Sequence, residues 1–371
     1  MNVLYLTMNP NRQSTTVPTE GWIRELKDRG LCPVIVSREK GDFQKWAESQ
    51  GVPCYNDPMP FPNKWRPLPY LRSLLNLRRI AKRHRTMLIH CNEQNIYPVG
   101  CSLAKWMKLP VVVSVHFTMA RDFCQWAFGG KRTPDKMFFL SRGSRDACQP
   151  GVDGIVPGNK TALLYNGLDM NHFKPCSERR ERFRTENNLS GIVVGVACAI
   201  RPRKQIEHLV KAVKKSGNHD VKVVIAGGPI AEDKEYAMQL FSWAKEELGD
   251  QLHLLGHLDE LRDFYNGIDI FVNTSQEEAC SISVIESLAC GCPILGYASK
   301  SVDDQIIPDG GEITPQDDID ELANNMNDWF QDASDLLERK SKARKQALAK
   351  FDISKLSEQL WNQYQSLMKS H

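Results

Sequence analysis

Short apolar runs alternate with amphipathic segments along the first half of the chain. The runs are apolar at nearly every position, as strands buried on both faces must be; they lie at residues 3–6, 33–36, 87–90, 111–115, 137–140 and 161–164. Residues 22–30 place apolar side chains at helical spacing and end at Gly30. This alternation predicts an α/β fold in which helices cover both faces of a parallel sheet.

The same pattern restarts after a polar stretch at residues 172–188, which contains Pro175 and many charges and is the predicted junction between two domains. The second series of apolar runs lies at residues 192–196, 221–226, 252–255, 268–272 and 293–295. A length of 371 residues fits two doubly wound units. An amphipathic segment carrying Leu360 and Tyr364 predicts a last helix near the C-terminus.

The overall charge is small, with a formal net value of +3, so the chain is not expected to bind nucleic acid. No apolar run approaches the length of a membrane helix, and the first residues do not read as a signal peptide. The 11 cysteines are scattered singly, apart from Cys290 and Cys292, which is typical of reduced thiols in a cytoplasmic protein.

Residues 64–85 are strongly basic, because no acidic residue occurs between Asp57 and Glu93. Leucines interleave with the arginines and lysines there. Three interpretations stay open: a helix lying on anionic lipid, a pocket for a phosphorylated or acidic acceptor, and a core-packed helix with a solvated basic face.

The strongest chemical pattern is at residues 271–293. A predicted strand ends near Asn273, a polar loop carries Glu278, and a predicted helix starts near Ser281 and contains Glu286. The free N–H groups and positive dipole of a helix N-terminus suit a phosphate. Carboxylates on either side suit the hydroxyl groups of a sugar nucleotide, although Glu278 taken alone could be a plain helix cap.

This segment resembles the signature of retaining glycosyltransferase family 4, the glycogen-synthase-like and mannosyltransferase-like group with the GT-B fold. That signature is Glu, seven residues, Glu, and a small-residue helix ending in Gly-x-Pro. Further stretches resemble the same family in the same order; they are residues 164–175, 200–204, 224–228 and 254–256. The resemblance covers nearly the whole chain.

The resemblance implies two Rossmann-like doubly wound parallel-sheet domains facing across a cleft, with a C-terminal helix that crosses back to the N-terminal domain. The N-terminal, acceptor-side domain is then residues 1–172 together with the crossing helix 352–371. The nucleotide-sugar domain is residues 173–351.

The implied reaction is transfer of a hexosyl group from a nucleotide sugar to an acceptor hydroxyl, with retention of configuration, by a front-face mechanism and without a metal or other cofactor. Expected catalytic residues are His116, Arg201, Lys204 and Glu278. Expected donor-binding residues are Ser14, Gly228, Leu255, Gly256, Cys280, Ser281, Ile282 and Glu286. Expected acceptor-side residues are Arg12, His90 and Asn92. The acceptor is a sugar, a lipid-linked molecule or a small molecule, which fits synthesis of a cell-envelope polysaccharide or glycolipid in the cytoplasm or at the inner face of the membrane.

Departures from the family pattern keep other functions open. Gln13-Ser14 stand where the family has Gly-Gly, Ala199 replaces its usual arginine, and residues 298–304 lack a second glycine pair. A GT-B nucleotide-sugar epimerase and a non-catalytic sugar-nucleotide-binding subunit are the alternatives. The Asp-x-Asp triplet at residues 318–320 reads better as a helix cap than as a metal site.

Overall fold

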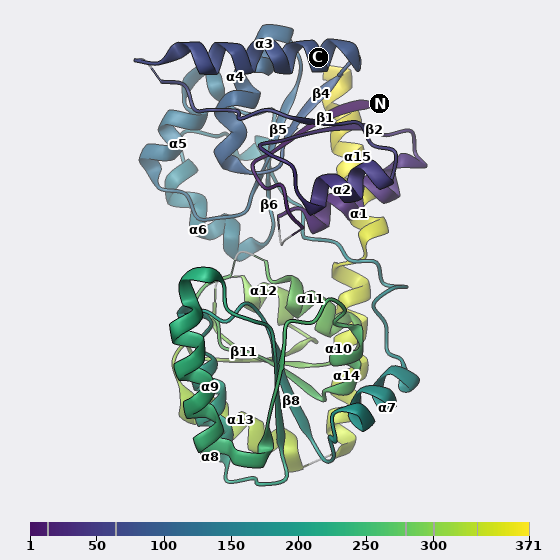
Figure 1. Ribbon diagram of the computed structural model, residues 1–371. Coiled ribbons are helices and arrows are strands. Elements are labelled where there is room, and N and C mark those ends of the chain that lie inside the picture. The colour runs from purple at the N-terminus through teal and green to yellow at the C-terminus, as the bar shows by residue number, and fades with distance from the viewer. Residues whose placement is uncertain (13–14, 64, 279, 300, 332, 371) are drawn as a thin grey trace. The chain divides into compact units, whose positions relative to one another are not determined.

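The computed structural model describes residues 1–371 apart from 13–14, 64, 279, 300, 332 and 371. It forms two compact units (Figure 1). The first contains Met1–Gly167 and Ile353–His371, and the second contains Leu168–Asp352. The sequence-based division placed these boundaries at 172/173 and 351/352.

The first unit is built on a seven-stranded parallel sheet with the order β3-β2-β1-β4-β5-β6-β7. The strands are β1 (Asn2–Thr7), β2 (Cys32–Ser37), β3 (Cys54–Asn56), β4 (Leu88–Cys91), β5 (Val111–Val115), β6 (Lys136–Phe139) and β7 (Thr161–Leu163). Most are the apolar runs of the sequence. The short edge strand β3 was not predicted, because its residues are only partly buried or exposed and carry no apolar run.

Helices cover both faces of this sheet (Figure 1). Because side chains alternate along a strand, Leu4 and Leu6 of β1 join the core on one face and Val3 and Tyr5 the core on the other. The first core includes α3 (Pro67–Arg83), α4 (Tyr97–Met107), α5 (Arg121–Phe128) and α6 (Arg142–Val152). The second includes α1 (Val17–Lys27), α2 (Asp42–Ser49) and α15 (Ile353–Ser370).

The C-terminal helix α15 is part of the first unit, which confirms the predicted crossing helix. Leu360 and Tyr364 are completely buried, and α15 packs against α1. The Tyr364 hydroxyl lies 3.2 Å from the Tyr5 hydroxyl in β1. A helix from the end of the chain therefore closes the core that β1 begins.

The second unit holds a six-stranded parallel sheet with the order β10-β9-β8-β11-β12-β13. Its strands are β8 (Val193–Ala197), β9 (Lys222–Ala226), β10 (Leu252–Gly256), β11 (Ile270–Asn273), β12 (Ile294–Tyr297) and β13 (Gly311–Thr314). The fold class is therefore the predicted pair of Rossmann-like units. The edge strand β13 was missed for the same reason as β3, since only its last residue is buried.

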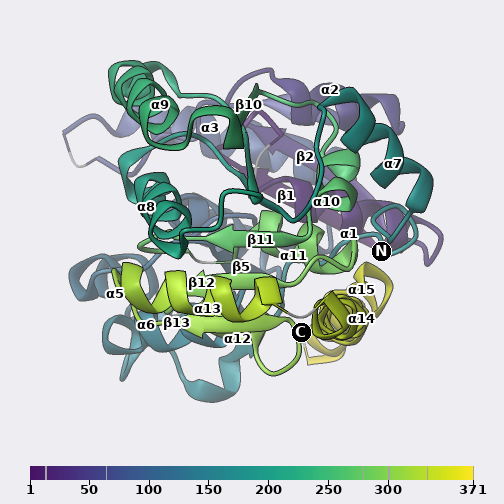
Figure 2. The same ribbon diagram turned by 90° about the horizontal axis from the view of Figure 1, so that it is seen from below.

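Helices also cover both faces of the second sheet (Figures 1 and 2). One face carries α8 (Ile206–Ser216), α9 (Lys234–Leu248) and α13 (Ile319–Gln331). The other carries α10 (Arg262–Gly267), α11 (Ile282–Ala289) and α14 (Ala333–Lys350), and α11 packs against α14. The short α12 (Val302–Ile306) lies beside β12 and β13.

The predicted junction at 172–188 contains a helix, α7 (Ser177–Glu186), which packs on α10. Its sequence is almost entirely charged and Phe183 is its one buried residue, so periodicity could not reveal it. Ion pairs hold it instead: Arg179 and Arg182 pair with Asp263, and Arg180 pairs with Asp269.

Both sheets reverse their strand order once, between β1 and β4 in the first unit and between β8 and β11 in the second. In open parallel sheets, ligands bind outside the carboxyl ends of the strands at such switch points. Each unit thus has one edge where a site is expected.

Tyr364→Ala should lower the free energy of unfolding by about 3 kcal/mol or more, because it removes a fully buried aromatic ring from the joint between α15 and the sheet. Denaturant unfolding of the purified protein measures this. Gln365→Ala on the exposed side of the same helix should cost less than about 0.5 kcal/mol. Equal effects of the two substitutions would contradict the role given to α15.

Candidate functional site

The switch point of the second unit brings together two predicted residues that are far apart in the sequence. Lys204 ends a short 3-10 turn, Pro202–Lys204, that follows β8, and Glu278 lies in the loop after β11. The Lys204 ammonium makes an ion pair with the Glu278 carboxylate, and each side chain is only 12% exposed. A lysine and a glutamate thus stand at the position where the topology predicts a ligand.

Backbone contacts fix these two loops against each other. The amide of Gln276 donates to the carbonyl of Arg203 at 3.0 Å, and the Thr274 hydroxyl donates to the carbonyl of Lys204 at 2.8 Å. The Arg203 guanidinium also donates to the carbonyl of Glu277 at 3.2 Å. The geometry of the Lys204–Glu278 pair is therefore set by main chain on both sides.

Arg201 lies at the same edge and is paired within the protein. Its Nε donates to a carboxylate oxygen of Asp233 at 3.0 Å, and the arginine side chain is 39% exposed. Asp233 follows β9 and was not singled out in the sequence. The pair leaves the outer part of the guanidinium open to solvent.

The N-terminus of α11 is partly occupied by a side chain of the protein. The amide of Ser281 donates to Oε1 of Gln305 at 2.9 Å, and Nε2 of Gln305 donates back to the Ser281 carbonyl at 3.0 Å. Gln305 is completely buried. Gln305 therefore holds the helix start in place. The Ser281 amide is already bonded to it, so this amide is not free for the expected contact with the sugar nucleotide. Among the described residues, the amides of Ile282 and Ser283 have no hydrogen-bond partner.

Cys280, which precedes this helix start, is 6% exposed, and Nε2 of Gln305 lies 3.5 Å from its sulfur. The expected contribution of Cys280 to donor binding can therefore come only from its main chain. Its neighbour Ala279 lies outside the described residues.

Glu286 lies further along α11 and faces α10. The Tyr265 hydroxyl donates to Oε2 of Glu286 at 2.9 Å. Burial raises the pKa of Glu286 to about 7, with a smaller contribution from the Glu260 carboxylate. The second glutamate of the motif is thus held in one orientation and is only partly ionised at neutral pH.

The ends of β9 and β10 close around the end of β8. The Gly227 amide donates to the Gly256 carbonyl at 2.6 Å, and the Ile200 amide donates to the Gly228 carbonyl at 3.0 Å. Gly227 has φ +130°, and a Cβ there would lie 1.8 Å from the Cys198 carbonyl oxygen, so only glycine fits. This brings the predicted donor residues Gly228, Leu255 and Gly256 to the edge that carries Arg201.

The switch point of the first unit centres on a carboxylate that the sequence analysis did not select. Glu93 is 3% exposed and accepts bonds from the Thr7 hydroxyl at 2.6 Å and the Met8 amide at 3.0 Å. Burial raises its pKa. Its position directly after β4 and Asn92 was a signal that could have identified it.

Asn92 and Arg12 both position the segment that leads into α1. Asn92 donates to the Thr15 carbonyl at 2.8 Å and accepts from the Thr19 hydroxyl at 2.6 Å. Arg12 makes a two-point ion pair with Glu20, at 2.8 and 2.9 Å. Ser14, the third predicted residue here, lies with Gln13 outside the described residues.

His116 follows β5 and lies at the same edge of the first sheet. Its amide donates to the Gln94 side chain at 3.1 Å, and the side chain bonds the backbone of Asn92. The other ring nitrogen, Nε2, has no hydrogen-bond partner in the part of the chain that the structure describes. Burial lowers the pKa of His116 to about 4, so the ring is neutral at pH 7.

His90 is not at this edge, and its assignment to the acceptor side is corrected here. It is completely buried; Nδ1 lies 2.5 Å from the Tyr364 hydroxyl and Nε2 lies 2.9 Å from the Ser114 hydroxyl. Its ring packs against Tyr5 and Trp22. Burial lowers its pKa to about 3. The side chain points into the core under α15, where no acceptor can reach it.

In the described part of the chain, no group of three or more His, Cys, Asp or Glu side chains could hold a metal ion. Asp318 of the Asp-x-Asp triplet accepts a bond from the Glu321 amide at 2.9 Å, at the start of α13. It is the helix cap that the sequence predicts. The described helices include none long and apolar enough to cross a bilayer.

Two family models match the chain. Residues 177–347 match the model described as glycosyl transferases group 1, and residues 15–149 match the glycosyl transferase 4-like domain. The two matches fall in the second and the first unit, respectively.

Two curated relatives match most of this chain. The sulfoquinovosyl transferase SQD2 of Arabidopsis thaliana is 26% identical over 309 residues, which is 79% of this chain and 58% of that protein. The alpha-monoglucosyldiacylglycerol synthase of Streptococcus pneumoniae is 24% identical over 309 residues, which is 76% of this chain and 67% of that protein. The matched stretches thus span about two thirds or less of these relatives.

Among solved structures, Anabaena HepE in complex with UDP superposes with a TM-score of 0.87 at 19% identity, covering 99% of this chain and all of that one. Its likeness establishes the fold of both units. With the two family models and the Lys204–Glu278 site at the switch point, the chain belongs to the GT-B glycosyltransferases of the family 4 type.

Proposed function

We propose that this protein transfers a hexosyl group from a nucleoside diphosphate sugar to an acceptor hydroxyl, with retention of configuration and without a metal ion. The observation that carries the proposal is the Lys204–Glu278 ion pair beside the start of α11, at the switch point of the second sheet. The UDP named for the HepE structure supports a nucleoside diphosphate as part of the donor.

The leaving group is a diphosphate, and its developing charge needs cations and N–H donors. Lys204 and the outer part of the Arg201 guanidinium supply positive charge at this edge. The amides of Ile282 and Ser283, at the positive end of the α11 dipole, are the donors left open beside Ser281. Charge-assisted bonds of this kind stabilise a departing phosphate.

The two glutamates of the motif then hold sugar hydroxyls on either side of the diphosphate. Glu278, which shares its carboxylate with Lys204, is assigned to the transferred hexose, and Glu286 to the ribose. The Tyr265 hydroxyl occupies one oxygen of Glu286, so a second hydroxyl can approach the other.

Retention follows from a front-face reaction in which the acceptor hydroxyl attacks the side that the diphosphate leaves. The bond from the anomeric carbon to the phosphate oxygen breaks, the bond to the acceptor oxygen forms, and the acceptor proton passes to the departing phosphate. No described carboxylate near the donor edge is assigned as a nucleophile. His116, neutral at pH 7 and with one ring nitrogen open, keeps its expected catalytic role at the switch point of the first unit.

The surface of α3 supports a lipid-linked acceptor. One side of the helix packs Leu74, Leu77 and Ile80 into the core. The opposite side exposes apolar residues and cations together. The exposed apolar residues of α3 are Leu68 at 65%, Leu71 at 49% and Leu75 at 46%, and Trp65, just before the helix, is 93% exposed.

The cations exposed in and around α3 are Arg66, Arg72, Arg79, Lys82, Arg83 and Arg85. An apolar and basic helix face suits anionic lipid, since the apolar side chains enter the headgroup boundary and the cations pair with phosphates. The name of the diacylglycerol-modifying relative agrees with a lipid acceptor. We therefore place the protein in the cytoplasm, in peripheral contact with a membrane, in polysaccharide or glycolipid synthesis.

A panel of nucleotide sugars with lipid and sugar acceptors should give transfer with at least one donor, and the product should keep the anomeric configuration of that donor. Lys204→Ala and Glu278→Gln should each cost at least about 2 kcal/mol of transition-state stabilisation, or about 30-fold in kcat/KM, because a leaving-group cation or a sugar contact is lost. Steady-state kinetics and NMR of the product measure both.

The matched control is Lys214→Ala, which breaks an exposed Lys214–Glu247 pair in the same unit and should leave turnover within about twofold. Donor binding without turnover on any acceptor would instead identify a sugar-nucleotide-binding subunit. An epimerised donor in the absence of acceptor would identify an epimerase.

Excess chelator should leave the rate unchanged, because cationic side chains and amides rather than a metal neutralise the diphosphate in this mechanism. The initial rate is measured after dialysis against chelator, with and without added magnesium or manganese. A loss of more than about tenfold that either ion restores would contradict metal independence.

Replacing Trp65, Leu68 and Leu71 together by serine should abolish binding to vesicles of mixed phosphatidylglycerol and phosphatidylcholine, since these side chains supply the apolar part of the α3 face. Co-sedimentation measures it. Met238→Ser, at a 73% exposed position in the second unit, should bind like the unmodified protein. Vesicle binding that changes neither with the triple substitution nor with the anionic lipid content would exclude the α3 face as the membrane contact.

A further inference from the structure

One cavity in the second unit has no assigned role in the proposed reaction. It measures about 470 Å³ and lies between the start of α7, α10, the C-terminal end of α11 and α14. Cavities of this size hold small molecules. Cys290 to Cys292, which line it, follow the last turn of α11, whereas the donor site is at the first turn. The cavity is therefore distinct from the diphosphate site, although Tyr265, which bonds Glu286, also lines it.

The wall of the cavity carries more positive than negative charge. Arg180 and Lys340 each approach Oδ1 of Asp269 at 2.6 Å, and Arg184 pairs with the other oxygen. Asp269 is 4% exposed and is the carboxylate that all three cations share. Lys340 has three N–H donors and only one bond to this carboxylate, so it keeps donors for a ligand.

Arg344, the third cation on the lining, makes no ion pair with a carboxylate of the described residues; burial lowers its pKa, and the nearby Asp352 carboxylate offsets part of that shift. Its guanidinium donates to carbonyl oxygens of Met170 at 2.8 Å, Phe173 at 2.8 Å and Ala289 at 2.6 Å. Carbonyls orient a guanidinium but do not neutralise it. Arg180, Lys340 and Arg344 on the lining, with Arg184 outside it, therefore outnumber the carboxylates of Asp269 and Asp352.

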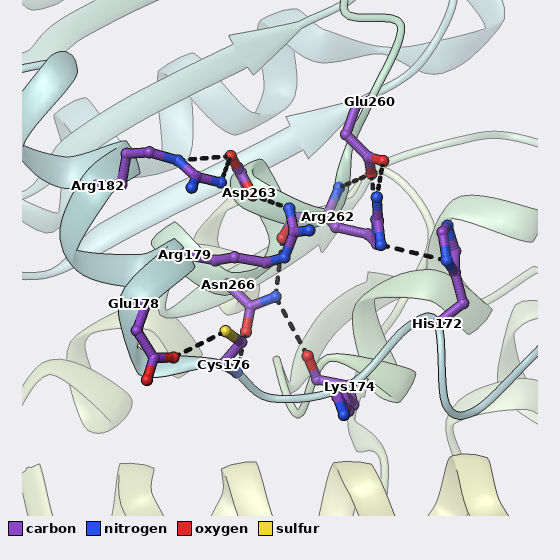
Figure 3. Close-up of polar contacts among 10 residues, drawn as sticks. All are labelled: His172, Lys174, Cys176, Glu178, Arg179, Arg182, Glu260, Arg262, Asp263 and Asn266. Carbon is purple, nitrogen blue, oxygen red and sulfur yellow. Dashed lines mark hydrogen bonds and ion pairs between the residues drawn. The ribbon is translucent and has the colours of Figure 1, made fainter.

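The wall formed by α7 and α10 is fixed before any ligand arrives (Figure 3). Asn266 accepts from the Cys176 amide at 2.7 Å and donates to the Lys174 carbonyl at 3.3 Å. Arg179 and Arg182 both pair with Asp263. A preformed wall lowers the ordering cost of binding.

The rest of the lining is apolar or neutral and includes Pro175, Ile268 and Leu337. The thiols do not offset the positive charge, because burial raises the pKa of Cys292 to about 12 and also raises that of Cys290. Both are thus protonated at neutral pH. The cavity combines a wall that has an excess of positive charge with an uncharged wall.

We propose that this cavity is a second anion site, which binds a phosphate group, either free or as the ester of a small molecule, against Lys340 and Arg344. The bond from Arg344 to Ala289 would connect such a ligand to the last turn of α11. The inference rests on the cavity and its charges alone and does not require the proposed transfer reaction.

The test measures binding of inorganic phosphate and of glycerol 3-phosphate by calorimetry at constant ionic strength. Leu337 lies on the lining and is 70% exposed, so substitutions there do not disturb the core. Leu337→Glu should weaken phosphate binding about 3- to 10-fold by repulsion, whereas Leu337→Gln, matched in shape and neutral, should bind like the unmodified protein. Tighter binding of glycerol 3-phosphate would identify an ester as the ligand, and equal binding would identify free phosphate.

Lys204→Ala serves as the second control, since phosphate could also enter the donor site. Phosphate binding that survives Lys204→Ala and is weakened by Leu337→Glu supports the proposal. Binding lost in Lys204→Ala but unchanged in Leu337→Glu would assign the phosphate to the donor site and overturn it. Absence of binding at about 10 mM phosphate would overturn it as well.

Discussion

The ion pair of Lys204 with Glu278 is the contact on which the proposed donor site depends. Both side chains are largely removed from water, so each charge needs the other, and loss of one partner leaves the second uncompensated. The hydrogen bonds between the two loops hold the pair at the switch point of the sheet. A site built this way can exchange one protein contact for a ligand contact without first ordering a loop.

The helix start beside this pair shows a second constraint. A buried glutamine, Gln305, satisfies both backbone groups of Ser281, and Gln346 of α14 donates to the carbonyl of Gln305 at 3.1 Å. Gln305 of α12 and Gln346 of α14 therefore fix the helix start at which the amides of Ile282 and Ser283 remain open. The N-terminal end of α11, the proposed phosphate site, thus takes its position from Gln305 and Gln346 as well as from the motif.

Much of this fold could be predicted from the sequence, because strands buried on both faces read as unbroken apolar runs. The edge strands β3 and β13 and the charged helix α7 could not, since their stability comes from neighbours and ion pairs. The motif predicted Lys204 and Glu278 as site residues, and the structure brings these two side chains together. His90 was misplaced because a position at a strand end does not say which face the side chain takes, and its partner Tyr364 is 274 residues away. Gln305 and Tyr265 carry no local signal at all.

The contribution of α15 to the first unit affects the order in which the chain can fold. Its core needs Leu360 and Tyr364, which leave the ribosome only after the entire second unit. During synthesis the face of β1 that carries Tyr5 can therefore be covered by α1 and α2 but not yet by α15, while the second unit can already complete its own sheet. Contacts between β1 and α15 form slowly because the two are so far apart in the sequence. We therefore expect the chain to be most exposed to aggregation, or to capture by a chaperone, before α15 has been synthesised.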